Sequence, residues 1–304
     1  MIRRPKPERF RLRRTMMFMN AQKPGLIKDA YIYGCDSIML DLEDAVAENQ
    51  KDSARFSLYH ALTTIDYGST EVIVRINGLD TPHWQEDIRV CVAGGADGIR
   101  IAKCESAQDV HTVEAAVEAA EKEFGVEVGR TLLMAALESP KGILNAYEIC
   151  SASDRMFGVA ISGGDFRKCM QTKFSPDGVD MLAARGQMLL AARAAGIQCF
   201  DTVFTDLDDN EGFKAEVLQN KDMGFDGKSL INPKQIRLVH EVFAPSEKEV
   251  KQAEAIVRAY KEQSAAGVGV FTVNGKMIDI AFIPGAERTL RLAKACGMYE
   301  GDLV

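Results

Sequence analysis

Short apolar runs alternate with longer amphipathic segments along most of the chain. The apolar runs predict buried strands at residues 15–19, 37–41, 72–76, 98–102, 132–137, 156–161, 199–203 and 227–231. The intervals carry helical periodicity, most clearly at 107–124 and 178–195, where apolar residues recur every three or four positions. Eight successive strand–helix units are typical of a (β/α)8 TIM barrel, so we expect an α/β fold with the barrel at residues 15–243.

An open, doubly wound parallel sheet is the alternative to a barrel. Such sheets commonly bind dinucleotides at a G-x-G-x-x-G turn that follows a strand. No predicted strand of this chain is followed by such a turn, so the sequence favours the barrel.

Residues 244–304 exceed what a barrel needs and form a predicted helical and hairpin extension. Ser246 and Glu249 show the capping-box pattern that opens a helix, and Asn274-Gly275 predicts a type I′ turn between two short strands. A last helix is expected at about 285–296. We expect so small a segment to have no core of its own and to pack on the barrel or on a neighbouring subunit.

Composition indicates a large core and a reducing environment. The 304 residues are 46% hydrophobic, which is enough to bury a core without disulfides or a structural metal. Seven cysteines without C-x-x-C spacing favour reduced thiols and a cytoplasmic protein. No apolar run approaches the ~18 residues of a membrane span, and no signal-peptide pattern is evident, so we expect no membrane association.

The net charge is −7, but the first fourteen residues are locally basic, with six arginines and one lysine against Glu8. Arg14, at the end of this arm, is a candidate for binding a phosphate-bearing cofactor, because guanidinium groups pair well with phosphate. A solvated tail is the alternative, and a mitochondrial transit peptide is disfavoured because the arm lacks serine. Aromatic residues do not alternate with the basic ones, and the rest of the chain is acidic, so nucleic-acid binding is not expected.

Two carboxylates follow neighbouring strands, at the end of a TIM barrel where catalytic groups gather. Glu138 follows the fifth strand, and Asp165 follows the sixth after two glycines that let the backbone approach closely. Such carboxylates suit a hard cation such as Mg²⁺, which keeps several waters for a substrate to displace. Glu138 and Asp165 are therefore the predicted metal ligands. The alternative for Glu138 is a cap of the helix that Pro140 would open.

Arg75 and Glu43 are candidates for the catalytic steps. Arg75 lies inside a strand, where a guanidinium needs an anion, and it would bind a substrate carboxylate or a developing oxyanion. Its alternative is a buried ion pair with the acids that end the second strand. Asp41 and Glu43 lie two residues apart and would both face the barrel mouth, although the helix dipole explains acids at a helix N-terminus equally well.

Several segments at strand ends together resemble one known family. They are DLEDAV (41–46), VRIN (74–77), ALESP (136–140), FDTV (200–203), GFDGKSLINP (224–233) and NGKMID (274–279). The order and approximate spacing of these segments are similar to those of citrate lyase β subunits, and the resemblance covers nearly the whole chain. The wider family includes malyl-CoA, citramalyl-CoA and related acyl-thioester lyases on the same barrel.

The resemblance implies Mg²⁺-dependent retro-Claisen cleavage of a citryl thioester on an acyl carrier protein, which yields oxaloacetate and an acetyl thioester. It assigns the metal to Glu138 and Asp165, with Glu138 also at the substrate, and it assigns stabilisation of the thioester enolate to Arg75. Asp279 of the NGKMID segment would reach the active site of a neighbouring subunit as an acid or base, which implies a homo-oligomer. The implied partners are a citrate lyase α subunit and an acyl-carrier γ subunit.

The chain departs from this family at Gly164, where an acidic residue usually precedes the metal aspartate. A non-catalytic paralogue is therefore one alternative. A stand-alone lyase for a CoA thioester such as citramalyl-CoA or malyl-CoA is another. A Schiff-base aldolase that uses Lys103 is a third alternative.

Overall fold

The computed structural model describes residues 4–265 and 267–304, and the chain divides into two compact units. The first unit comprises residues 1–239 and the second residues 240–304. The division lies close to residue 243, where the sequence predicts the end of the barrel.

The first unit is built on a closed barrel of eight parallel strands, which confirms the predicted fold class. The strands are β1 (Thr15–Asn20), β2 (Ser37–Asp41), β3 (Glu71–Arg75), β4 (Gly98–Ile101), β5 (Leu132–Leu137), β6 (Met156–Ile161), β7 (Gln198–Asp201) and β8 (Gly227–Leu230). Each strand pairs with the next along the chain, and β8 returns to β1, where Lys228 lies opposite Thr15. All the predicted strands are present, with ends that differ by at most two residues.

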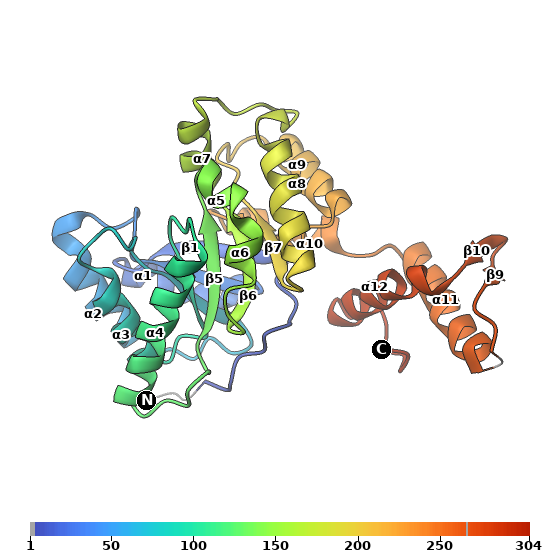
Figure 1. Cartoon of the computed structure of the whole chain (residues 1–304), viewed down its shortest axis with the longest axis horizontal. Helices are drawn as coiled ribbons and strands as arrows, with labels where there is room; N and C mark the ends of the chain where they lie inside the picture. Colours follow the sequence, from blue (N-terminus) through green and yellow to red (C-terminus); the bar gives the residue numbers. More distant parts are fainter. Residues whose placement is uncertain (1–3, 266) are drawn as a thin grey trace. The chain divides into compact units, whose positions relative to one another are not determined.

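Helices follow the strands and lie around the outside of the barrel (Figure 1). They are α1 (Pro24–Ile27), α2 (Lys51–Thr64), α3 (Trp84–Gly94), α4 (Ala107–Glu123), α5 (Pro140–Leu144), α6 (Ala146–Cys150), α7 (Gly163–Met170), α8 (Val179–Ala194), α9 (Asn210–Met223) and α10 (Lys234–Phe243), with short 3-10 turns at η1 (Ala30–Tyr33) and η2 (Glu48–Gln50). Ser106 caps α4: its side chain accepts a hydrogen bond from Asp109 N–H, and the Asp109 carboxylate accepts one from Ser106 N–H. This capping box satisfies N–H groups that the first turn of the helix cannot pair internally.

The barrel interior holds an apolar cluster that gives way to charged side chains near the carboxyl ends of the strands. The cluster consists of Met16, Met39, Ile73, Leu132, Met134, Phe157, Ala160 and Phe200, each at most 7% exposed, with Phe18 packed against it. Because inward positions alternate along a strand, the next inward residues of β2, β3 and β4 are Asp41, Arg75 and Arg100. This polar layer forms the floor of the candidate site.

The basic arm is bound to the amino-terminal end of the barrel, and so the solvated tail considered for it was wrong. Its ion pairs join Arg4 to Asp97 (2.6 Å), Arg13 to Glu71 (2.7 Å) and Arg14 to Asp36 (2.9 Å). These acids lie just before or at the start of β4, β3 and β2, the end of the barrel opposite to the catalytic end. Residues 1–3 of the arm lie outside the described residues.

The second unit contains the predicted helices and hairpin. Its elements are α11 (Glu247–Ala265), β9 (Phe271–Val273), β10 (Lys276–Ile278), the 3-10 turn η3 (Ile280–Phe282) and α12 (Ile283–Ala295). Asn274 and Gly275 have φ angles of 50° and 77°, as a type I′ turn requires, so the predicted turn is confirmed.

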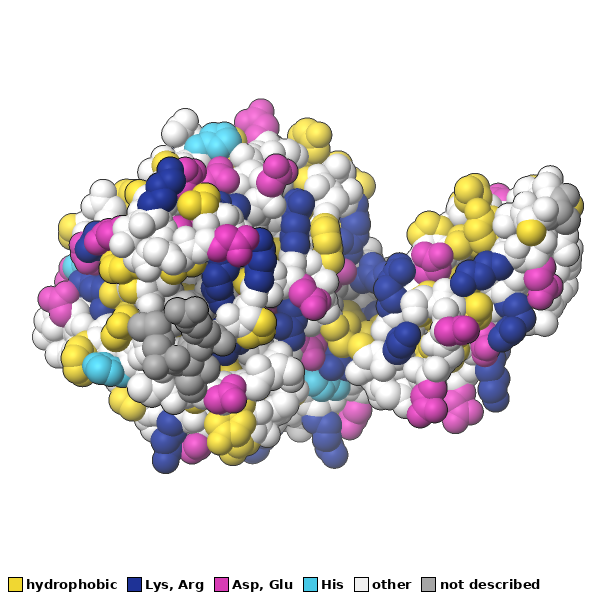
Figure 2. Space-filling model, turned by 90° about the horizontal axis from the view of Figure 1, so that it is seen from below, with side chains coloured by type: hydrophobic (Ala, Val, Ile, Leu, Met, Phe, Trp, Pro, Cys, Tyr) yellow, Lys and Arg dark blue, Asp and Glu magenta, His cyan; other side chains and the backbone are white. Residues whose placement is uncertain are grey.

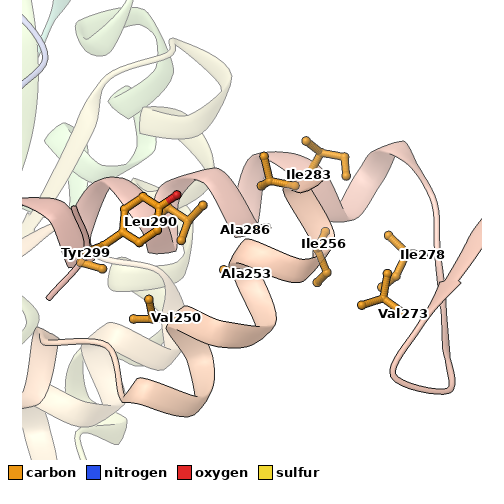
Figure 3. Close-up of a cluster of buried hydrophobic side chains, with 11 residues drawn as sticks. Val250, Ala253, Ile256, Val273, Ile278, Ile283, Ala286, Leu290 and Tyr299 are labelled. Carbon is orange, nitrogen blue, oxygen red and sulfur yellow. The ribbon is translucent and has the colours of Figure 1, made fainter. Parts of the chain in front are cut away.

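The expectation that this extension has no core of its own was wrong. Eleven residues form a buried apolar cluster in it: Val250, Ala253, Ile256, Val257, Val273, Ile278, Ile283, Ala286, Leu290, Ala293 and Tyr299. Helices α11 and α12 pack along one another, and Val273 and Ile278 of the hairpin point toward Ile256 (Figure 3). Two amphipathic helices and a hairpin thus bury each other's apolar faces, which a single helix could not do.

The charged surface is mixed in sign. On the face that Figure 2 shows, Lys and Arg side chains lie interspersed with Asp and Glu. Among the described residues, no helix has the length and apolar character needed to span a membrane.

Candidate active site at the carboxyl ends of the barrel strands

The structure brings the two predicted metal ligands, Glu138 and Asp165, to one cavity of about 650 Å³. Glu138 directly follows β5, and Asp165 lies in the first turn of α7, close behind β6. Lys103 and Lys168 also line this cavity, so it mixes carboxylates with ammonium groups. The site lies at the end of the barrel where the sequence predicts it.

The Glu138 carboxylate is buried and only partly satisfied. Its Oε1 accepts hydrogen bonds from Lys103 N–H (3.2 Å) and Ser162 Oγ (3.3 Å), whereas Oε2 has no partner among the described residues. Burial, together with the nearby charge of Glu43, raises the pKa of Glu138 to about 7. Glu138 does not cap α5, because the Ser139 side chain accepts the hydrogen bond from Gly142 N–H at that helix start.

A close backbone contact places Asp165. Gly163 N–H donates to Thr202 Oγ1 at 2.8 Å, and a Cβ at Gly163 would lie 2.9 Å from the same hydroxyl oxygen. Glycine at position 163 therefore lets α7 begin directly against Thr202, the residue after β7. Two residues later, the half-buried Asp165 lies at the cavity wall.

The carboxylates of Glu138 and Asp165 fit a hard divalent cation. A cation beside Oε2 of Glu138 would pair an oxygen that has no partner within residues 4–265 and 267–304, and it would favour the ionised form that burial disfavours. The described residues contain no cluster of three or more His, Cys, Asp or Glu side chains arranged to hold a metal. Mg²⁺ matches such a set, because it commonly takes one or two carboxylates and keeps several waters.

Arg75 forms the buried ion pair that the sequence left open as an alternative. Its Nε and Nη2 donate to the two carboxylate oxygens of Asp41 at 2.8 and 2.7 Å, and Nη1 lies 2.9 Å from Glu43 Oε2. Burial alone would raise the pKa of Asp41, but the hydrogen bonds and charge of Arg75 lower it. Arg75 nevertheless lines a second cavity of about 390 Å³, so its charge borders the space open to a substrate.

Lys103 is held as a cation by Glu43. The Lys103 Nζ lies 2.8 Å from Glu43 Oε1, and this contact raises the pKa of Lys103. Burial raises the pKa of Glu43, and it outweighs the lowering effect of the nearby Arg75 and Lys103 charges. A Schiff-base lysine must lose its proton to attack a carbonyl, so the raised pKa argues against the aldolase alternative.

The structure gives no support for the predicted role of Arg14, and it places Asp279 outside the barrel unit. Arg14 hydrogen-bonds to Asp36 through its side chain at the opposite end of the barrel, which provides no support for the predicted cofactor contact. Asp279 belongs to the second unit, where it caps η3 by accepting a hydrogen bond from Ala281 N–H at 2.9 Å.

Sequence reasoning missed Arg100, which lines the 390 Å³ cavity together with Arg75, Ser162 and Asp165. The signal was present, because Arg100 is a charged residue inside the apolar run GIRIA, just as Arg75 is inside VIVRI. An arginine inside a strand needs an anion, and this holds for Arg100 as it does for Arg75.

A closed parallel barrel with carboxylates and guanidinium groups at the carboxyl ends of its strands defines the class of TIM-barrel enzymes. A profile described as HpcH/HpaI aldolase/citrate lyase matches residues 14–233, and one described as a C–C bond lyase of the TIM-barrel fold matches residues 177–298. The chain belongs to the HpcH/HpaI aldolase/citrate lyase family.

Similar proteins match most of the chain. Citrate lyase subunit beta of Leuconostoc mesenteroides is 52% identical over 96% of this chain and 97% of that protein. The crystal structure of CitE from Mycobacterium tuberculosis with magnesium, acetoacetate and coenzyme A has a TM-score of 0.73 and 28% identity, and the match covers 92% of this chain and 98% of that one. A citrate lyase beta subunit from M. tuberculosis with oxaloacetate and magnesium has a TM-score of 0.64 and 29% identity, over 76% of this chain and 96% of that one.

Proposed function

We propose that this protein is the carbon–carbon lyase component of a citrate lyase and cleaves a citryl thioester into oxaloacetate and an acetyl thioester. The observation that carries the proposal is the buried Glu138 carboxylate, whose Oε2 has no partner among the described residues and which shares a cavity with Asp165. The 52% identity to a citrate lyase subunit beta supports the same reaction.

Mg²⁺ is the proposed cofactor, with Glu138 and Asp165 as its protein ligands. When bound, it supplies Lewis-acid polarisation of the substrate's hydroxyl and carboxylate oxygens, which eases loss of the hydroxyl proton. The magnesium in the two M. tuberculosis structures supports this choice.

The cleaved bond joins the hydroxyl-bearing carbon to the CH₂ group beside the thioester carbonyl. As the hydroxyl loses its proton it becomes the ketone of oxaloacetate, and the electron pair of the broken bond leaves on the acetyl thioester as an enolate, which then takes up a proton. We assign stabilisation of that negative charge to Arg75, a fixed cation that Asp41 and Glu43 hold at the cavity wall. Glu43 thereby acts on the reaction as a positioning residue.

We further propose that the substrate arrives on an acyl-carrier γ subunit and that an α subunit acts as the transferase that regenerates the citryl thioester. The name of the L. mesenteroides relative, a subunit beta, supports an assembly with other subunits. Within this assembly we propose that Asp279 serves the site of a second copy of the chain as an acid or base.

Oxaloacetate release tests the reaction and the carrier together. We expect release from citryl thioester on the carrier protein in the presence of Mg²⁺, and loss of release when EDTA removes the metal. Turnover of citramalyl-CoA or malyl-CoA without release from a citryl thioester would replace the proposal with a stand-alone CoA thioester lyase. Release from none of these substrates would contradict the proposed lyase.

Isothermal titration with Mg²⁺ tests the metal site independently of turnover. We expect Glu138→Ala to abolish Mg²⁺ binding, because a two-carboxylate site cannot lose one ligand and keep its affinity. Glu105→Ala is the matched control, since Glu105 lines the same cavity but contacts Ser139 and Lys141, and its variant should bind Mg²⁺ as the wild type does. Unchanged Mg²⁺ affinity in Glu138→Ala would show that the metal ligands are assigned wrongly.

A further inference from the structure

Arg100 is a buried cation at an inward position of β4, and its side chain is only partly paired. The residue is 1% exposed, and its Nη2 donates to Ser162 Oγ at 3.1 Å. Its Nε and Nη1 have no hydrogen-bond partner among residues 4–265 and 267–304. Burial and the nearby charge of Arg75 lower the pKa of Arg100 to about 10, the direction expected where a cation has too little negative charge around it.

The neighbouring Arg75, by contrast, is a buried guanidinium whose nitrogens are fully paired with carboxylates. Arg75 and Arg100 lie opposite one another in the β3–β4 pairing, and Arg75 is paired on three nitrogens by Asp41 and Glu43. A buried charge without an anion is costly, and proteins keep one mainly where a ligand completes it. The two free nitrogens of Arg100 therefore point to an anionic ligand.

The surrounding space connects Arg100 to the proposed metal site. Arg100 lines the 390 Å³ cavity, and Asp165 lines both this cavity and the 650 Å³ cavity that Glu138 shares. Ser162 also links Arg100 to Glu138. Its hydroxyl accepts a hydrogen bond from Arg100 and donates one to Glu138 Oε1 at 3.3 Å. A ligand held at Glu138 and Asp165 thus lies beside the cavity that Arg100 lines.

We propose that Arg100 binds the substrate carboxylate that lies farther from the metal, the group that becomes the second carboxylate of oxaloacetate. This inference rests on the proposed lyase function. A hydroxyl and its adjacent carboxylate would suit a cation held by Glu138 and Asp165, which would leave the other carboxylate of the same half without a cation. A substrate whose hydroxy-acid half ends in a methyl group offers Arg100 no anion, so Arg100 makes the site selective for dicarboxylates.

Isothermal titration of the Mg²⁺-loaded protein with oxaloacetate and with pyruvate isolates this contact, because both share the 2-keto acid group and only oxaloacetate carries the second carboxylate. We expect the wild type to prefer oxaloacetate. In Arg100→Met we expect oxaloacetate affinity to fall roughly 10- to 100-fold, the usual effect of losing hydrogen bonds to a charged group, with pyruvate affinity within about two-fold of wild type.

Three further variants complete the test. Arg100→Gln is a second neutral variant held to the same criterion, should Arg100→Met not fold, and Arg100→Lys should lie between wild type and Arg100→Met because it keeps the charge but loses the fork of donors. Arg89→Met, on the exposed side of α3, is the control and should bind both acids as wild type does. Circular dichroism melting should show no loss of stability in Arg100→Met, since a neutral side chain replaces an incompletely paired buried charge.

The outcomes separate this inference from the proposed function. Equal losses for both acids in the neutral variants, or no loss for oxaloacetate, would overturn the role of Arg100 and leave the lyase proposal standing. Wild-type protein that binds neither acid with Mg²⁺ and releases no oxaloacetate would overturn the lyase proposal, and the role of Arg100 with it.

Discussion

Two adjacent glycines precede Asp165, and only the second of them has room for a side chain. A Cβ at Gly163 would lie 2.9 Å from Thr202 Oγ1, whereas a Cβ at Gly164 would meet nothing within 4 Å. Gly163 is therefore required by the close contact between the start of α7 and Thr202, the residue after β7. Gly164 is not sterically required, so the acidic residue that the family usually carries there has room in this chain.

We expect Gly164→Glu to fold at least as stably as the wild type, because an acid in the first turn of a helix contributes about 0.3–1 kcal/mol. The added charge next to Asp165 should also tighten Mg²⁺ binding, since affinity rises with the number of carboxylates at a cation site. Thermal melting and isothermal titration with Mg²⁺ measure the two effects. Gly163→Ala is the matched control and should lower the melting temperature, and the reverse order of stabilities would contradict this account.

At the scale of elements, a buried group of charges joins β7 and β8 to α8 and α9. Lys228 Nζ contacts Asp201 at 2.7 Å and Glu216 at 2.5 Å, and Arg185 contacts the same two carboxylates at 2.8 and 3.0 Å. Burial alone would raise the pKa of Asp201, but Lys228 and Arg185 outweigh it and hold that pKa well below its usual range. Lys228, at the amino-terminal end of its strand, thus has a structural role.

This group makes the fold sensitive to acid. Because the pKa of Asp201 is lowered in the folded protein, its ionised form stabilises the fold above the unfolded pKa of about 4, and that contribution is lost as pH falls below it. Lys228→Met leaves one negative charge unbalanced, so we expect a loss of about 3–5 kcal/mol at pH 7 and acid unfolding at a higher pH. Urea denaturation and an acid titration followed by circular dichroism measure both.

Arg193→Met is the control for Lys228→Met. It breaks a half-exposed pair with Asp226 and should cost no more than about 1 kcal/mol. If Lys228→Met unfolded in acid at the wild-type pH, the buried group would not be what stabilises this part of the barrel.

The sequence predicts the elements of this fold better than the partners of its charged residues. Strands and helices follow from local periodicity, which is why the barrel strands are found within two residues of their predicted ends. Ion pairs join residues far apart in the chain, as with Arg75 and Asp41, which are 34 residues apart, and only the closed barrel brings them together. For the same reason, local periodicity could not predict that Arg14 binds Asp36. The inward position of Arg100, however, could have been inferred from the alternation of side chains along its strand.

At the scale of the whole molecule, Asp279 and the proposed metal ligands belong to different compact units of the chain. The extension has its own buried core, and Asp279 directly follows the hairpin that packs into it (Figure 3). If Asp279 serves a neighbouring copy, each active site takes Glu138 and Asp165 from one subunit and Asp279 from another. If active sites are shared in this way, a mixed oligomer of two inactive variants can contain one intact site, because both substitutions can fall in the other site.

We expect Glu138→Ala and Asp279→Asn each to abolish oxaloacetate release, and mixed oligomers of the two to regain it. In a dimer, one site would combine the intact metal ligands of the Asp279→Asn chain with the intact Asp279 of its partner, so activity should return to about half that of the wild type. Co-expression under two affinity tags and sequential purification isolates the mixed species. A mixture of Glu138→Ala with Asp165→Asn is the control and should stay inactive, because every site then lacks a metal ligand. If the first mixture also stays inactive, Asp279 does not act on a neighbouring subunit.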